Sequence, residues 1–483
     1  MKKLIQKTIK PKKKNFKQQQ NSKIIGVTAV VVCVFLGMMV YLGYFVATNE
    51  QEMINNSYNS RQQILLSKNY RGTIYSADGY VLAETIIKEN GAEKRNYPFE
   101  NMFSHVIGFS TKGRTGVEDF SNYYLINSNI SLSEKVENTM AGKKNPGNNV
   151  YTTLDMDVQK AAYNALGMYK GAIIVTEVKT GKVLAMVSKP DFNPNEIVTI
   201  WDDLLEDTES TVLLNRVTTG LYPPGSTFKV LSSLEYIREH EQDYMNYKYQ
   251  CRGSYKLADS TIHCYHNSVH NSVNLAKSFA KSCNSSYANI GMQLDRKSFA
   301  KTLETLKFNQ GLALDFTTAV SKTPVSENVS DEEMLQASIG QGTVQISPVH
   351  LNMITASIAN DGIAMKPYLV DRIQTATGVQ VHSYKPKEYD RFMSEEESAI
   401  LRELMVEVVE NGTANRLSGY GYTVGGKTGS AEYNSLGDSH AWFTGFAPVE
   451  NPEIAITVLI ESAGSGGDYA VPIARRVLDA YFK

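Results

Sequence analysis

Ser226 and Lys229 lie near the middle of the 483-residue chain and have the types and spacing of an activated nucleophile. Pro223, Pro224 and Gly225 end the preceding structure, and the apolar residues after Ser226 recur at helical spacing. This pattern predicts that Ser226 occupies the first turn of a buried helix. Lys229 then projects from the same face, where its amine can reach the serine hydroxyl and activate it.

Two later motifs supply the other polar groups that acyl chemistry would need. They are Ser282-Cys283-Asn284 and Lys427-Thr428-Gly429. A Ser-x-x-Lys pattern alone is weak evidence, because it recurs at residues 278–281 and 298–301. A second Lys-Thr-Gly, at residues 179–181, lies between two apolar runs and predicts only the turn of a β-hairpin over residues 172–187.

A neutral serine needs a base, and Lys229 can be that base only after it has lost its proton. Burial beside a second cation, Lys427, would lower the pKa of Lys229 from ~10.4 toward neutrality. We therefore expect Ser226 to attack an acyl carbonyl. Ser282 would relay a proton to the leaving amine, and the Asn284 amide would pair with an amide of the substrate.

The residues around Lys427 suit a peptide substrate. Lys427 and Thr428 can bind a substrate carboxylate, and Gly429 has no Cβ, so that an extended peptide can lie against this predicted strand. The backbone N–H groups of Ser226 and Ser430 would form an oxyanion hole, in which the loss of one donor costs ~3–4 kcal/mol.

The N-terminus carries a basic tail followed by an apolar run. Residues 1–23 contain nine lysines and no acidic residue, although the whole chain has a net charge of -1. Residues 24–47 contain no charged residue and exceed the ~20 residues that a transmembrane helix needs. We expect a retained anchor, because the run is longer than the ~7–15 residues of a signal-peptide core. The tail then indicates a cytoplasmic N-terminus and an extracytoplasmic bulk, rather than binding of nucleic acid.

The rest of the chain predicts two domains of unequal size. Residues 48–148 are too few and too polar for a large core and predict a small α+β pedestal module. Residues 149–483 predict an α+β domain with a central antiparallel sheet and helices on both sides, in which one central helix carries Ser226. Its expected elements are a strand at residues 150–154, the hairpin at 172–187, strands at 422–431, 441–447 and 454–460, and a helix at 472–482.

Several motifs together resemble the transpeptidase domain of class B penicillin-binding proteins. They are Asn215-Arg216, residues 222–229, Ser282-Cys283-Asn284, residues 339–342, residues 411–414, residues 426–431 and residues 441–448. The resemblance extends from about residue 149 to the C-terminus. Residues 71–83 resemble the start of the pedestal of the same family, which is unusually short here. No glycosyltransferase domain fits between the anchor and the pedestal, which argues against the bifunctional class A proteins.

The resemblance implies a serine β-lactamase-like fold and D,D-transpeptidation of peptidoglycan. A D-alanyl-D-alanine stem peptide would acylate Ser226 and release D-alanine, and the acyl group would pass to an amine of a neighbouring stem, with no cofactor required. β-Lactams would acylate the same serine. The family also implies a partner, a membrane glycosyltransferase of the shape, elongation, division and sporulation type. Ser430 stands where the family usually has threonine, which affects substrate contacts more than the oxyanion N–H.

Other functions compete with crosslinking. The protein could be a non-catalytic membrane scaffold that activates a partner glycosyltransferase, and water in place of the acceptor amine would give some D,D-carboxypeptidase activity. Residues 421–428 also satisfy the phosphate-loop pattern of nucleotide-binding proteins. That pattern requires a helix beginning at Lys427, which Gly429 and the polar loop at residues 434–438 disfavour.

Cys251 and Cys264 form a separate candidate site. They lie in the part expected outside the membrane, where they could form a disulfide. His266 and His270 follow Cys264 at a spacing that a tetrahedral zinc ion could use. A structural zinc ion, a disulfide and two free thiols remain alternatives. Of the other cysteines, Cys33 lies in the apolar run, and position 283 is expected to be a packing residue inside its motif.

Overall fold

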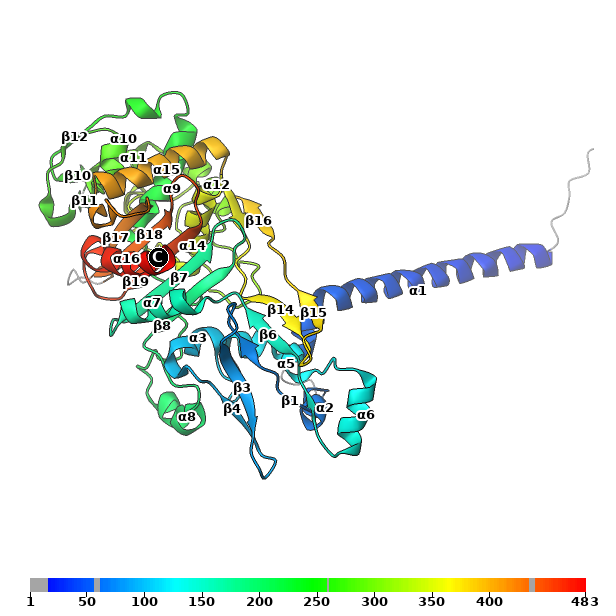
Figure 1. Ribbon diagram of the computed structural model, residues 1–483. Helices are drawn as coiled ribbons and strands as arrows, with labels where there is room; N and C mark the ends of the chain where they lie inside the picture. Colours follow the sequence, from blue (N-terminus) through cyan, green and yellow to red (C-terminus); the bar gives the residue numbers. More distant parts are fainter. Residues whose placement is uncertain (1–15, 56–60, 259, 434–438) are drawn as a thin grey trace, which may run out of the picture. The chain divides into compact units, whose positions relative to one another are not determined.

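The computed structural model describes residues 16–55, 61–258, 260–433 and 439–483 (Figure 1). The chain forms two compact units, residues 1–62 and residues 63–483. The first unit contains helix α1 (Phe16–Asn55). Within α1, the stretch Lys23–Val46 is exposed throughout and has a mean hydropathy of 2.6, so that it is a candidate membrane span by length and composition.

A five-stranded antiparallel sheet forms the centre of the larger unit (Figure 1). Its spatial order is β17-β18-β19-β7-β8, so that strands from the two ends of the domain pair with each other. The predicted hairpin is strands β7 and β8, and Lys179-Thr180-Gly181 lies in its turn. The strand bounds are β7 Gly171–Glu177, β8 Val183–Lys189, β17 Gly425–Glu432, β18 Ser439–Ala447 and β19 Ile454–Ile460.

Helices cover both faces of this sheet. Every residue of β18 and β19 is buried, which requires packing partners on both sides. Helix α14 (Pro348–Ala359) packs on β7, β18 and β19. The helices α7 (Met156–Leu166) and α16 (Val471–Tyr481) pack on each other and on the same sheet. The α+β class and the antiparallel central sheet predicted from the sequence are confirmed.

Ser226 lies in a tight turn rather than in the first turn of an α-helix. A 3₁₀ turn, η2 (Gly225–Phe228), leads into helix α9 (Lys229–Glu239). Gly225 has φ +53°, and a Cβ there would lie 2.8 Å from the carbonyl oxygen of Ser430. Because glycine has no Cβ and adopts this φ easily, the turn can approach strand β17 more closely than another residue would allow.

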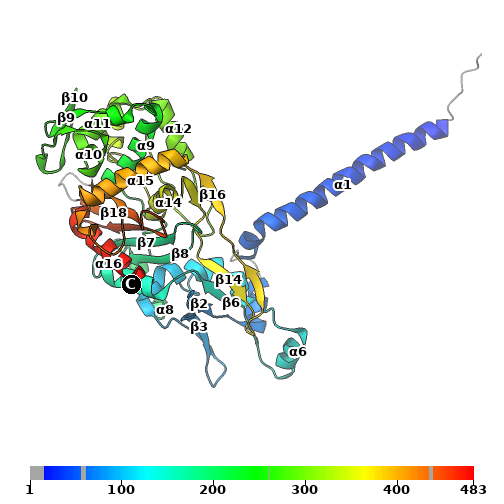
Figure 2. The same cartoon turned by 45° about the horizontal axis from the view of Figure 1, so that its top comes forward.

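Most of the remaining helices gather beside α9 and β17, whereas α8 packs against Phe109 near the pedestal strands (Figures 1 and 2). Helix α15 contacts α9, α10 and β17, and α11 contacts α9. The bounds are α8 Ile197–Glu206, α10 Leu275–Ala280, α11 Asn284–Gln293, α12 Arg296–Thr305, α13 Asp331–Ala337 and α15 Glu395–Glu410. Two short ribbons lie near α11, one of β9 Tyr249–Cys251 with β12 Asn271–Val273 and one of β10 Ser254–Leu257 with β11 Ser260–His263.

A second sheet of six strands, in the order β15-β14-β6-β2-β3-β4, contains the strands of the predicted pedestal module. The strand predicted at residues 150–154 is β6, and it pairs with β2 of the pedestal and with β14 instead of joining the central sheet. Two strands from far along the chain thus complete the pedestal sheet. The bounds are β2 Ile74–Tyr75, β3 Val81–Ile87, β4 Glu93–Asn96, β6 Asn149–Thr152, β14 Val370–Gln374 and β15 Gln380–Ser383.

A buried ion-pair cluster fastens the pedestal helices to its strands. Glu118 is fully buried and accepts hydrogen bonds from Arg71 Nε at 2.5 Å and from Arg95 Nε at 2.7 Å. Burial raises the pKa of Glu118, but the two arginines outweigh it and the net shift is downward. The short helices here are α2 Arg61–Lys68, α3 Ser104–Ile107, α4 Gly116–Phe120, α5 Asn122–Ile126 and α6 Leu132–Met140.

Candidate active site

Ser226 faces a cavity of about 1000 Å³. The cavity is also lined by Ser282, Asn284, Thr428 and Ser430, so that together with Ser226 three separate stretches of the sequence meet here. Among the described residues, no group makes a hydrogen bond to the Ser226 hydroxyl. The hydroxyl is therefore open to an incoming substrate.

Lys229 is fully buried and contacts two residues that line this cavity, Ser282 and Asn284. Its Nζ donates hydrogen bonds to the Ser282 carbonyl oxygen at 2.8 Å, to Ser282 Oγ at 3.3 Å and to Asn284 Oδ1 at 2.6 Å. The same Nζ lies 5.3 Å from the centre of the Tyr287 ring. These contacts hold Lys229 in place at the first residue of α9, directly after the turn that carries Ser226.

Lys427 reaches Ser282 from strand β17. Its Nζ donates to Ser282 Oγ at 3.0 Å and to the Thr428 carbonyl oxygen at 3.0 Å, and its side chain is fully buried. Ser282 Oγ therefore accepts from two lysines that are about two hundred residues apart in the sequence. A hydroxyl that bridges two amines is in position to move a proton between them.

Burial shifts the pKa of both lysines downward. It lowers the pKa of Lys229 to about 7, against a smaller opposing effect of the nearby thiols of Cys283 and Cys264. Burial first, and then the charge of Lys229, lower the pKa of Lys427 well below its usual value. A large fraction of Lys229 is then neutral near pH 7, which is the state that a general base needs.

Ser282 sits in a strained turn. Its φ is +54°, a left-handed conformation that non-glycine residues rarely adopt and that costs ~1–3 kcal/mol. The Ser282 N–H donates to the Phe279 carbonyl at 3.1 Å, and the Cys283 N–H donates to the Ser278 carbonyl at 2.9 Å. These bonds, with the lysine contacts, hold the turn so that the side chains of Ser282 and Asn284 both point at Lys229.

Strand β17 forms the edge of the central sheet beside the cavity and carries Thr428, Gly429 and Ser430. A Cβ at Gly429 would lie 2.9 Å from the Pro224 carbonyl oxygen and 3.1 Å from the Thr227 side chain. The absent side chain therefore makes room for the Ser226 turn, whereas the sequence had suggested room for a substrate. An extended peptide can still pair with the open backbone edge of β17.

Other polar groups at this site were not singled out from the sequence. Thr413 Oγ1 hydrogen-bonds Thr428 Oγ1, and Trp442 Nε1 donates to the Pro223 carbonyl at 3.0 Å. The first contact fixes the hydroxyl of a predicted substrate-binding residue, and the second ties strand β18 to the nucleophile turn. Both residues belong to motifs of the resemblance, which was the only signal that could have found them.

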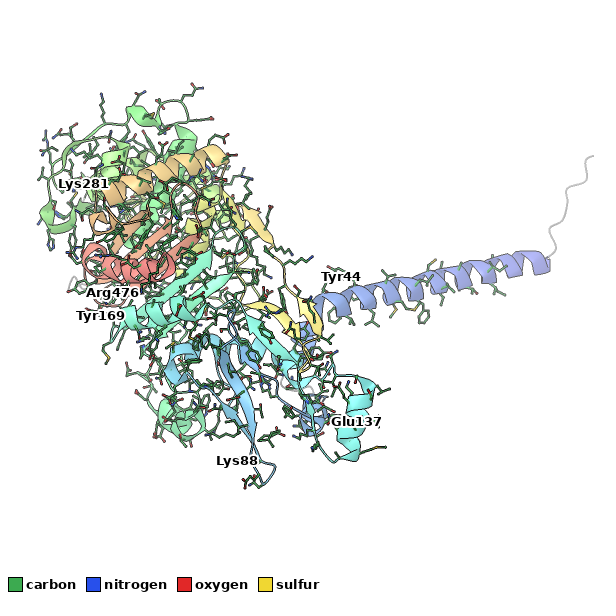
Figure 3. All side chains as sticks on the ribbon, viewed as in Figure 1. Tyr44, Lys88, Glu137, Tyr169, Lys281 and Arg476 are labelled. Carbon is green, nitrogen blue, oxygen red and sulfur yellow. The ribbon has the colours of Figure 1, made fainter. Side chains whose placement is uncertain are left out.

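The competing motifs do not form similar sites. Lys281, labelled in Figure 3, is exposed, while Ser278 is buried and hydrogen-bonds Ser286, so that this Ser-x-x-Lys pair is separated. Lys427 lies within a β-strand, and no helix begins there, which excludes the phosphate-loop interpretation. The loop at residues 434–438 lies outside the described residues.

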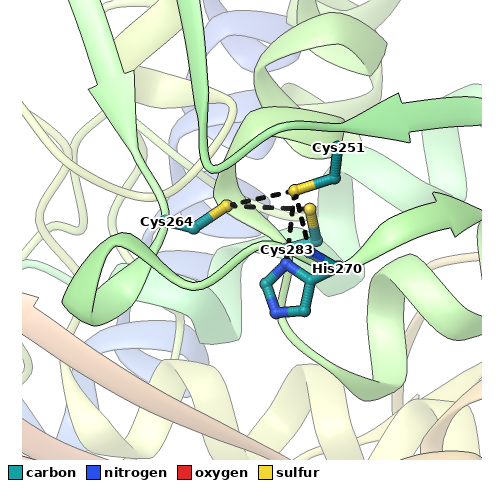
Figure 4. Close-up of side chains that lie close together, drawn as sticks. All are labelled: Cys251, Cys264, His270 and Cys283. Carbon is teal, nitrogen blue, oxygen red and sulfur yellow. Dashed lines mark hydrogen bonds between the residues drawn. The ribbon is translucent and has the colours of Figure 1, made fainter.

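Four side chains with metal-binding atoms meet next to the Ser282 turn (Figure 4). They are Cys251, Cys264, His270 and Cys283. His266, which the sequence had suggested as a ligand, is not among them, because it is exposed and lies against Tyr265. Cys283 takes its place in the cluster, and it is fully buried there, as expected of a packing residue.

A model of the penicillin-binding protein transpeptidase domain matches residues 171–479, which is more than half of the chain. The chain belongs to the penicillin-binding protein transpeptidase family. A second model, of the penicillin-binding protein A dimerisation domain, matches residues 71–150. Penicillin-binding transpeptidases use a serine nucleophile and need no cofactor, as the resemblance implied.

Curated relatives of this penicillin-binding protein include two named transpeptidases. Peptidoglycan D,D-transpeptidase PbpA of Mycolicibacterium smegmatis is 30% identical over 454 residues, which cover 87% of this chain and 91% of that protein. Peptidoglycan D,D-transpeptidase MrdA of Acinetobacter baumannii is 28% identical over 80% of this chain and 65% of that protein.

Solved structures of the family share the fold. The imipenem acyl-enzyme complex of penicillin-binding protein A from Mycobacterium tuberculosis has a TM-score of 0.79 and 27% identity, and the match covers 86% of this chain and 99% of that one. The D,D-transpeptidase domain of a peptidoglycan glycosyltransferase from Eggerthella lenta has a TM-score of 0.78 and 28% identity, over 86% and 98%. The predicted class B family is thus confirmed.

Proposed function

We propose that this penicillin-binding protein is a peptidoglycan D,D-transpeptidase that works through a Ser226 acyl-enzyme. The observation that carries the proposal is the convergence of Lys229 and Lys427 on Ser282 Oγ, next to the open hydroxyl of Ser226. The named D,D-transpeptidases among its relatives and the acyl-enzyme complexes of its structural neighbours support the same chemistry.

The proposal gives a role to each group in the acylation step. Neutral Lys229 takes the proton of Ser226, and the freed oxygen attacks the carbonyl carbon of the penultimate D-alanine of a stem peptide. The backbone N–H groups of Ser226 and Ser430 would stabilise the oxyanion. Ser282 passes a proton from the lysine pair to the leaving D-alanine amine, so that the C–N bond breaks.

The second step transfers the acyl group to an amine. The amine of a neighbouring stem peptide attacks the ester carbonyl, Lys229 takes the proton of that amine, and Ser226 regains its own proton as the ester bond breaks. Water in place of the amine would give D,D-carboxypeptidase activity at the same site. Neither step requires a metal ion.

Substrate binding would use the edge of the central sheet. A stem peptide extended along β17 can pair with the strand backbone near Gly429. The terminal carboxylate would bind the Thr428 hydroxyl, which lines the cavity and which Thr413 holds in place. The Asn284 amide donates to the His263 carbonyl at 2.9 Å, and so it sits at the cavity wall where a substrate amide would pass.

The proposed setting is the outer face of a membrane. The apolar stretch of α1 is a candidate span, and the lysine-rich tail before it favours a cytoplasmic N-terminus. The catalytic unit would then lie outside, where peptidoglycan is found. A membrane glycosyltransferase of the shape, elongation, division and sporulation type would be the partner that supplies glycan strands for crosslinking.

Labelling with a fluorescent penicillin tests the proposal. The full chain in detergent should become labelled, the label should map to Ser226 by mass spectrometry, and a Ser226→Ala variant should remain unlabelled. Absence of the label from the folded wild-type protein contradicts acylation. If Ser226→Ala supports normal crosslinking in cells in place of the wild type, the scaffold function accounts for the protein instead.

A further inference from the structure

The thiol cluster has the dimensions of a tetrahedral metal site (Figure 4). Cys264 Sγ lies 3.8 Å from Cys251 Sγ and 3.8 Å from Cys283 Sγ, and Cys251 Sγ lies 3.4 Å from His270 Nδ1. All four ligand atoms lie within 4.8 Å of one another. Two thiolates bound at ~2.3 Å to a tetrahedral zinc ion are ~3.8 Å apart, and a thiolate and an imidazole nitrogen are ~3.6 Å apart. The side chains therefore need little movement to enclose an ion.

The number and spacing of the sulfur atoms argue against a disulfide. A disulfide bond is ~2.0 Å long and joins two cysteines, which would leave the third thiol of this cluster unpaired. Cys251 and Cys283 are fully buried and Cys264 is 2% exposed, so that none of them meets a solvent-borne partner. Three sulfurs and one imidazole are a ligand set typical of a closed structural zinc site.

Hydrogen-bond donors around the sulfurs suit negatively charged thiolates. The backbone N–H of His270 donates to Cys251 Sγ at 3.4 Å, and the backbone N–H of Ser285 donates to Cys264 Sγ at 3.5 Å. Ser285 Oγ also donates to Cys251 Sγ at 3.2 Å. Donors of this kind commonly orient metal-bound thiolates and reduce their charge.

The cluster is continuous with the active site. Cys283 lies between Ser282 and Asn284, the two residues whose side chains bind Lys229. Cys264 follows His263, whose carbonyl accepts the hydrogen bond from Asn284. The ligands also join the β9–β12 ribbon, the end of β11 and the start of α11, which are short elements with little core of their own. An ion here would fix the strained Ser282 turn and one wall of the cavity together.

We propose that Cys251, Cys264, His270 and Cys283 bind one Zn²⁺ ion, and that this ion holds the Ser282–Asn284 turn in the form that acylates Ser226. The ion is enclosed by four protein ligands, so that it has no open position and takes no part in the chemistry. Its binding is independent of the proposed transpeptidase function, whereas its effect on acylation rests on that function.

Metal analysis of the purified full chain tests the binding. We expect about one zinc ion per chain, and replacement by Co²⁺ should give the visible absorption of a tetrahedral ion together with thiolate-to-metal charge transfer. Cys251→Ser and His270→Ala should lose the metal. The matched controls Cys33→Ser, in α1, and His266→Ala, an exposed neighbour of the cluster, should keep it. A metal-free wild type, a disulfide between any two of the three thiols, or zinc retained by both ligand variants overturns the proposal.

Chelation of the wild-type protein tests the coupling without relying on variants that could misfold. Removal of zinc should slow labelling by fluorescent penicillin about 10–100-fold, and added Zn²⁺ should restore it. Cys33→Ser should label at the wild-type rate. Unchanged labelling after verified zinc removal overturns the coupling while leaving the transpeptidase function intact. Conversely, zinc bound stoichiometrically to a chain that never becomes labelled contradicts the function and not the metal site.

Discussion

Asn284→Asp should move the pH dependence of Ser226 acylation to higher pH. Asn284 Oδ1 lies 2.6 Å from Lys229 Nζ, so that an aspartate there places a negative charge against the proposed base. An opposite charge at this range raises a lysine pKa by ~1–3 units. From about 7, the pKa of Lys229 would move to roughly 8–10. The neutral fraction at pH 7 then falls from about half to roughly 10–0.1%, and acylation slows about 5- to 500-fold.

Stopped-flow or gel measurements of fluorescent-penicillin labelling between pH 5.5 and ~10 would check this shift. The wild-type rate should rise with pH and reach half of its plateau near the pKa of Lys229. The variant should recover toward its own plateau at high pH. Asn284→Ala is the matched control, since it removes the same contact without adding charge, and it should lower the plateau without raising the midpoint. A variant midpoint equal to that of the wild type would show that Lys229 is not the titrating base.

Three further variants report on the turn, on the lysine pair and on the pedestal. Gly225→Ala places a side chain at φ +53° against the Ser430 carbonyl, and thermal unfolding should show a loss of ~1–3 kcal/mol with slower labelling. Lys229→Met should abolish labelling. Between pH 6 and 9 the free energy of unfolding of the wild type should rise by about 2–3 kcal/mol relative to that of this variant, because the buried lysine loses its charge above its lowered pKa. Glu118→Gln leaves two buried arginines without their carboxylate and should lower the free energy of unfolding by ~3–5 kcal/mol. Because the pKa of Glu118 is lowered, this difference from the wild type should shrink as the pH falls through that pKa. Unfolding at several pH values measures both effects.

Local patterns in the sequence were sufficient for the central sheet. The hairpin at residues 172–187 and the strands predicted at 441–447 and 454–460 are visible as apolar runs bounded by turn residues, because they are buried on both faces. The pedestal sheet was less accessible. Strands β14 and β15 come from beyond residue 369; β14 pairs with β6, and β15 pairs with β14. Such long-range pairing leaves no mark in a short window of sequence.

The same division applies to the site. The sequence by itself determined the spacing of Ser226 and Lys229 and the identities of the other polar motifs, since a turn of helix and a strand each fix their own side chains. Only the tertiary structure decided that Lys427 and Lys229 share Ser282, that the missing side chain of Gly429 admits the nucleophile turn, and that Cys283 rather than His266 joins the thiols. These contacts depend on how separate elements approach in space, and the burial that lowers the lysine pKa values arises only when those elements pack together.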